Sequence, residues 1–251
     1  MFNVIKSDLY RMTKSKSFYL YWILLVVTYT ISVVMKAAGG VQVGMGVDPT
    51  LKLDLQMVAM NFTYYFLFLF PVYGIVVSDF GEKTIKNTIS SAISRRTYII
   101  SKFILTEVYT IGSFVLGNVM YYVVNSLVNG KKYTSEFSTF MAAVLRQCPI
   151  MIAVVALLVA IGFLLKRMAS FNAITILVPM IYTSVAVSVY QAGAEKFAED
   201  YMLKYELSTM LNKIVANVNA DYFRNCVLAS IVILVISVVI GYNSFKKTEI
   251  K

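Results

Sequence analysis

Six apolar stretches, each long enough to cross a lipid bilayer as a helix, set the main constraint on the fold. An α-helix rises 1.5 Å per residue, so about 20 residues cross a hydrocarbon core of roughly 30 Å. Pro71, Pro149 and Pro179 fall within three stretches and should kink those helices. The pattern predicts an all-α integral membrane protein, a single transmembrane domain over residues 1–251 with six spans. The spans run approximately from Phe18 to Met35, Met57 to Ser78, Ile99 to Val128, Phe140 to Leu165, Phe171 to Tyr190 and Cys226 to Phe245.

Few side chains in this sequence can support catalysis or metal binding. Charged residues make up 14% of the chain, against roughly 25% in soluble proteins. Histidine is absent, and the only cysteines are Cys148 and Cys226, so histidine acid–base chemistry, zinc clusters and disulfide scaffolds lack their residues. Both cysteines lie near predicted outer helix ends, where we expect free thiols rather than a disulfide. We expect no catalytic, metal-binding or cofactor-binding residue in the chain.

The distribution of basic residues predicts the orientation in the membrane. With the N-terminus inside, 14 of the 23 lysines and arginines lie on the cytoplasmic side, as the positive-inside rule requires. Topology thus accounts for the net charge of +10, and a nucleic-acid partner is not needed to explain it. The first apolar run follows a segment containing Asp8 and lacks a cleavage site, so it should remain as a span. We expect a multi-pass protein of the cell membrane with both termini cytoplasmic.

Residues 1–17 form an amphipathic pattern before the first span. Phe2, Ile5, Leu9 and Met12 recur at helical spacing, and basic residues such as Lys6 lie at other positions around the helix. This pattern is typical of a helix in the inner membrane interface, with its apolar side toward the acyl chains. The alternative is a disordered basic tail.

A second helical pattern lies in residues 79–98, between the second and third spans. Ile85, Ile89 and Ile93 follow one another at intervals of four, so a short cytoplasmic helix would carry one aliphatic stripe. Such a stripe can dock in a groove of another protein. It can equally pack on this protein's own helices or on lipid, and the pattern alone does not separate these possibilities.

The run from Asp79 to Lys102, DFGEKTIKNTISSAISRRTYIISK, resembles the signature region of type-2 ATP-binding-cassette (ABC) exporter permeases. The layout also resembles that of the small permease subunits of peptide-antibiotic and bacteriocin export and immunity transporters. In that family the loop is a coupling helix that docks on the ATPase subunit. The resemblance implies a docking surface formed by Gly81, Glu82, Lys83, Thr84, Ile85, Asn87, Ile89, Ile93 and Arg95.

The resemblance also implies partners. The sequence contains no Gly-x-x-x-x-Gly-Lys-Ser/Thr phosphate loop, so ATP and Mg²⁺ would be bound by a separate cassette ATPase. The family works as dimers, which implies a second, identical or related, permease chain beside this one.

Two further features concern the outer half and the membrane interior. Residues 192–225 mix aromatic, aliphatic and charged side chains, which predicts one or two outer amphipathic helices, although an ordinary solvated loop is the alternative. Arg146 and Gln147 are expected to reach from the fourth span to the outer surface. Glu107 lies inside the third span, where it should face the bundle, water or a cation such as Lys102, and its role is left open.

The sequence thus favours an ABC exporter permease for amphipathic or lipophilic cargo, with membrane-active or antimicrobial peptides as the leading class. The spans are rich in aromatic residues and methionine and nearly free of charge, which suits apolar surfaces better than ions. The alternatives are an ion-coupled carrier, for which Glu107 is the main candidate residue, and a membrane anchor or sensor without transport. The cargo, the type of dimer, and the choice between export and self-immunity stay open.

Overall fold

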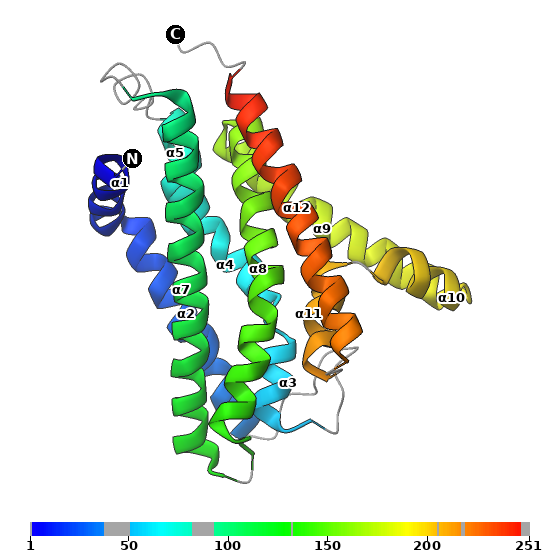
Figure 1. The fold of residues 1–251 in the computed structure, drawn as a ribbon. Coiled ribbons are helices and arrows are strands. Elements are labelled where there is room, and N and C mark those ends of the chain that lie inside the picture. Colours follow the sequence, from blue (N-terminus) through cyan, green and yellow to red (C-terminus); the bar gives the residue numbers. More distant parts are fainter. Residues whose placement is uncertain are drawn as a thin grey trace.

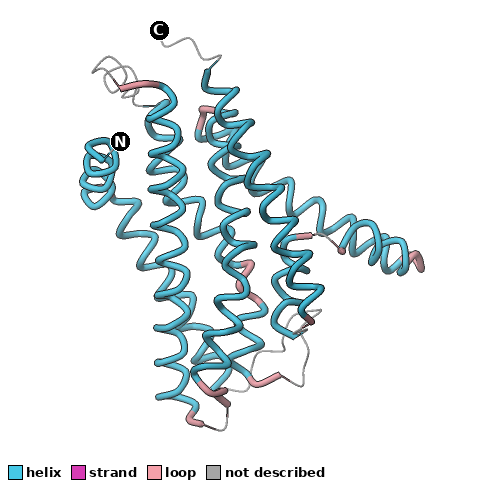
Figure 2. Tube along the Cα trace, viewed as in Figure 1, coloured by secondary structure: helices cyan, strands magenta, loops and turns pink. Residues whose placement is uncertain are grey.

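Helices are the only regular elements in the described part of the chain, which comprises residues 2–37, 51–81, 93–131, 133–204, 206–216 and 219–246 of a computed structural model (Figures 1 and 2). Five of them are long and apolar enough to cross a membrane: Thr63–Gly81, Arg95–Asn129, Phe137–Leu165, Met168–Gln191 and Ala220–Lys246. The chain is therefore an all-α, multi-pass membrane protein. The N-terminal helix and the last turn of the C-terminal helix lie at the same end of the bundle (Figure 1).

The elements follow one another as an up-and-down array. They are α1 (Phe2–Lys14), α2 (Lys16–Ala37), α3 (Leu53–Ala59), α4 (Thr63–Val72), the π-helical η1 (Tyr73–Val77), α5 (Ser78–Gly81), α7 (Arg95–Asn129), α8 (Phe137–Leu165), α9 (Met168–Gln191), α10 (Glu195–Phe197), the π-helical η2 (Ala198–Leu203), α11 (Leu207–Ala216) and α12 (Ala220–Lys246).

The first two predicted spans differ in part from the observed helices. Helix α2 covers the first, but its described apolar part runs only over Lys16–Ile31, so a sixth span stays a prediction. The second was expected from Met57, whereas a turn at residues 60–62 separates α3 from α4. Pro71 lies inside α4, and η1 follows directly. Proline has no N–H to donate, so the helix widens by one π-helical turn at this point.

Helix α8 is the centre of the bundle. Its apolar side chains point in every direction, and most of them are buried against α7, α12 and α4. Small residues allow close contacts: a Cβ on Gly162 would lie 3.2 Å from Val77, and one on Gly241 of α12 would lie 3.2 Å from Phe103. By contrast, α9 diverges from the bundle (Figure 1) and leaves an apolar surface exposed.

Gly117 lets α7 approach α2 and α4. A Cβ at this position would collide with the Tyr64 hydroxyl and touch Leu25. We therefore expect Gly117→Val to destabilise the protein by about 1–3 kcal/mol, the usual cost of overpacking. Gly112→Val is the matched control, because a Cβ on Gly112 meets no atom within 4 Å. Denaturant unfolding in mixed micelles measures the free energy of unfolding of both variants. Equal stabilities of the two variants would contradict this packing.

A helix, α1, is present where the interfacial helix was predicted, but the face that packs on the bundle differs from the predicted stripe. Val4, Asp8 and Met12 are buried at intervals of four, whereas Leu9 and Tyr10 are exposed. The helix thus packs on the bundle through a face that contains a carboxylate. Leu9 and Tyr10 form the side that we expect to meet the acyl chains.

Residues 192–225, predicted as an outer segment, contain the short helices α10, η2 and α11 and the first turns of α12. In α11, Met210, Leu211, Ile214 and Val215 are buried and Lys213 is exposed, and the helix packs on α8 and α3. Helix α12 begins at Ala220, before the predicted start at Cys226. Cys148 and Cys226 are both free thiols.

Candidate functional site

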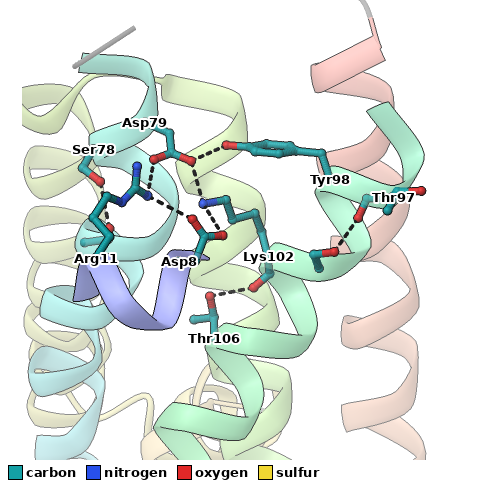
Figure 3. Close-up of polar contacts among 10 residues, drawn as sticks. Asp8, Arg11, Ser78, Asp79, Thr97, Tyr98, Lys102 and Thr106 are labelled. Carbon is teal, nitrogen blue, oxygen red and sulfur yellow. Dashed lines mark hydrogen bonds and ion pairs between the residues drawn. The ribbon is translucent and has the colours of Figure 1, made fainter. Parts of the chain in front are cut away.

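Five polar side chains from three parts of the chain meet at the end of the bundle where α1 lies (Figure 3). Asp8 and Arg11 come from α1, Asp79 from α5, and Tyr98 and Lys102 from the first turns of α7. We call these five residues the charge cluster. It connects the N-terminal helix to both flanks of the segment 82–92.

Lys102 is the centre of the charge cluster. Its side chain is completely buried, and Nζ lies 2.8 Å from Asp8 Oδ2 and 2.6 Å from Asp79 Oδ2. Arg11 forms a second bridge between the carboxylates, 3.3 Å from Asp8 Oδ1 and in contact with Asp79 Oδ1. The Tyr98 hydroxyl donates a hydrogen bond of 2.5 Å to Asp79 Oδ2. Each carboxylate therefore contacts both cations.

Local sequence explains why these side chains converge. Ser94 caps α7, because its Oγ accepts a hydrogen bond of 3.1 Å from the Thr97 backbone N–H. This start places Tyr98 and Lys102, four residues apart, on one face of the helix. Asp8 and Arg11 share a face of α1 at a spacing of three, and Asp79 lies in the last turn of the continuous α4–η1–α5 helix.

The charges of the cluster balance, with two carboxylates against two cations. Burial raises the pKa of the Asp8 carboxyl, the nearby Lys102 ammonium opposes that rise, and the Asp79 carboxylate adds to it. A buried ion pair is costly to assemble, but removing one partner leaves an uncompensated buried charge. Such a cluster therefore adds little net stability, but it holds three chain segments in fixed relative positions.

An aromatic cluster lies on the other side of Tyr98. The Tyr98 ring stacks on Phe245 of α12 with centroids 5.3 Å apart, and Phe245 also contacts Phe80 of α5 and Phe163 of α8. Arg95 Nη1 donates a hydrogen bond of 2.8 Å to the carbonyl of Lys246 at the end of α12. The two flanks of segment 82–92 are thus fixed to α8 and α12 as well as to α1.

Three of the predicted docking residues are described. Gly81 is exposed and a Cβ there would meet no atom within 4 Å, Ile93 packs partly on the core, and Arg95 is exposed. A hollow of about 510 Å³ opens beside Gly81, lined also by Lys166 and Arg167. The other six predicted docking residues, Glu82, Lys83, Thr84, Ile85, Asn87 and Ile89, lie outside the described residues.

Glu107 does not pair with Lys102, which is engaged by Asp8 and Asp79. Both of its carboxyl oxygens are buried, and neither has a hydrogen-bond partner among the described residues. The expectation that Glu107 faces the bundle fits these buried oxygens.

The expectation that Gln147 reaches the outer surface is wrong, because its side chain is completely buried. Its Nε2 donates to the carbonyls of Val58 at 2.8 Å and Leu211 at 3.0 Å, and its Oε1 accepts from Asn61 Nδ2 at 2.8 Å. Asn61 Nδ2 also lies 3.2 Å from Asn118 Oδ1. This amide network joins α3, the turn before α4, α7, α8 and α11.

Sequence reasoning missed Asp8, Arg11, Tyr98 and Lys102 as one site. A signal existed in the sequence. Asp79 and Lys102 lie near the ends of apolar spans, where an unpaired charge is costly, and Asp8 lies on the face of α1 that packs on the bundle. The pairing itself could not be read, because α1 and α7 lie far apart in the sequence.

Comparison with protein-family models and with curated proteins found no match to this chain.

Proposed function

We propose that the chain is the transmembrane permease subunit of an ATP-driven ABC exporter in the cell membrane, with both termini cytoplasmic. A separate cassette ATPase would bind ATP and Mg²⁺ and dock on the segment around residues 82–92. A second permease chain would complete the transporter. The cargo would be amphipathic or lipophilic, with membrane-active or antimicrobial peptides as the leading class.

The main support for this proposal is the contact between the two ends of the run that resembles the permease signature. Asp79, the first residue of the run that resembles the permease signature, contacts Lys102, the last. The two ends of the intervening segment are therefore held together by one buried ion pair. A partner that pushes on the segment would move α1, α5 and α7 together, which is what a coupling element requires.

Other features support the cargo class and the second chain. A hollow of about 180 Å³ between α4, α8, α9 and α11 has a mostly apolar lining with one carboxylate, Glu206. That combination suits an amphipathic molecule with a cationic group. Helices α9 and α12 expose apolar side chains such as Leu177, Ile181, Val232 and Val235, which would face lipid or the second permease chain.

Co-purification with a cassette ATPase encoded nearby tests the proposal. Changing Ile85 and Ile89 to Asp should abolish the complex, because two charges would enter the apolar docking stripe. Changing Thr88 and Ser91 to Asp is the matched control, since the same charges are added beside the stripe, and the complex should persist. Survival of the complex in the isoleucine variant would refute the docking surface, and failure of the unchanged chain to bind any cassette ATPase would refute the exporter assignment.

A further inference from the structure

Glu107 carries a carboxyl group that is enclosed by the bundle and has no polar partner among the residues that the structure describes. Both oxygens are buried, and in the described part of the chain no hydrogen bond or ion pair reaches them. The residue lies 12 positions after Arg95, about 18 Å along α7 at 1.5 Å per residue. It is therefore inside the apolar helix Arg95–Asn129, five residues beyond Lys102 of the charge cluster.

Ser237 of α12 is another buried polar group, and its hydroxyl has no hydrogen-bond partner within the described ranges. Phe103 packs on Gly241, and α7 and α12 run in opposite directions (Figure 1). Glu107 lies one turn after Phe103 on α7, and Ser237 lies one turn before Gly241 on α12. Because the two helices are antiparallel, Glu107 and Ser237 lie at the same level along the bundle. Ser230 donates to the carbonyl of Cys226 at 2.8 Å, whereas the Ser237 hydroxyl makes no such bond.

A proton is the ligand that fits these groups. An ionised carboxylate in apolar surroundings carries a large desolvation cost, whereas the protonated form is neutral and can donate one hydrogen bond. A hard metal cation would need about six oxygen ligands. One turn before Glu107, Phe103 packs instead on Phe163 and Gly241.

Titratable groups on the neighbouring helices do not compete for this role. Residues 152–165 of α8 and 228–241 of α12, the stretches that include Phe163 and Gly241, contain none. On α2, Tyr21 contacts Ser113, and on α4, Tyr64 contacts Tyr29. The acids and bases of α1 and α5 that approach α7 are held in the charge cluster.

We infer that Glu107 is a proton-binding site, protonated while α12 packs on α7 and deprotonated to water when the two helices separate. Proton release would then favour the separated arrangement, because only that arrangement hydrates the carboxylate. The site links the packing of the bundle to pH, whether ATP or an ion gradient drives the protein.

Carbodiimide labelling tests the inference directly. Dicyclohexylcarbodiimide is apolar and reacts with protonated carboxyl groups. In the full chain in lipid nanodiscs at neutral pH, mass spectrometry should find Glu107 modified several-fold more than the exposed Glu136. The modification should decline at alkaline pH. Absence of Glu107 modification at both neutral and mildly acidic pH would overturn the inference.

Thermal unfolding provides a second, independent measurement. The unchanged protein should lose stability as the pH rises, because its carboxyl must ionise in an apolar place, whereas Glu107→Gln should lose much less. Glu136→Gln should behave like the unchanged protein. Parallel pH profiles for Glu107→Gln and the unchanged protein would overturn the inference. Neither measurement needs nucleotide or a partner subunit, so the result is separate from that of the exporter test.

Discussion

Replacing Lys102 by methionine should destabilise the protein by about 3–5 kcal/mol, the usual cost of breaking a buried ion pair by removing one partner. Lys102 is completely buried between Asp8 and Asp79. Without its ammonium group, the two carboxylates would share Arg11 alone. Methionine keeps most of the side-chain volume, so the loss reports charge rather than packing. Denaturant unfolding of the purified protein in mixed micelles measures the effect.

Two variants make this expectation specific. Lys6→Met removes the same group from the exposed side of α1 and should change stability little. The double change Lys102→Met with Asp8→Asn restores neutrality to the cluster and should recover part of the loss. If Lys102→Met were as stable as Lys6→Met, the charge cluster would not hold the three segments together.

The loss caused by Lys102→Met should also depend on pH. Lys102 opposes the rise in the pKa of Asp8 that burial produces, so its removal should raise that pKa further. A group whose pKa is higher in the folded than in the unfolded state stabilises the fold at low pH. This stabilisation is lost as the pH rises through the pKa of the folded state. The difference in free energy of unfolding between the variant and the unchanged protein should therefore be smaller in mildly acidic than in alkaline buffer.

The sequence predicted helical membrane spans well because apolar runs depend on composition alone. Five of the six predicted spans correspond to long apolar helices. The internal break before Thr63 was missed, since Met57 to Ser78 reads as one apolar run. The break becomes understandable only when Asn61 is seen to bond with Gln147 and Asn118, two residues from other helices.

The charge cluster and the amide network show a common limit of reading one sequence. Lys102 and Gln147, both in the first part of an apolar span, were expected to act locally, toward Glu107 or toward the surface. Their partners come instead from α1, α3, α5 and α11. Which polar group meets which is decided by helix packing, and the spacing of residues along one helix carries no information about it.

Gln147→Leu is expected to cause the second large loss of stability. The change removes the side-chain hydrogen bonds that Gln147 makes with the carbonyls of Val58 and Leu211 and with Asn61 Nδ2. The Val58 carbonyl keeps the Asn61 backbone N–H at 3.1 Å, so each lost hydrogen bond should cost about 0.5–1.5 kcal/mol. Leucine matches the volume closely, so no large cavity should form. Denaturant unfolding measures the total loss.

A local measurement shows where that loss arises. Leu211 lies in α11, and its bond to Gln147 helps to hold this short helix on the bundle, so α11 should open more often in Gln147→Leu. Trypsin should then cut after the exposed Lys213 several-fold faster than in the unchanged protein. Gln191→Leu, at the exposed end of α9, should leave both stability and cleavage unchanged. Equal cleavage in the two variants would show that α11 is held by its apolar face alone, and that the amide network does not couple it to the membrane helices.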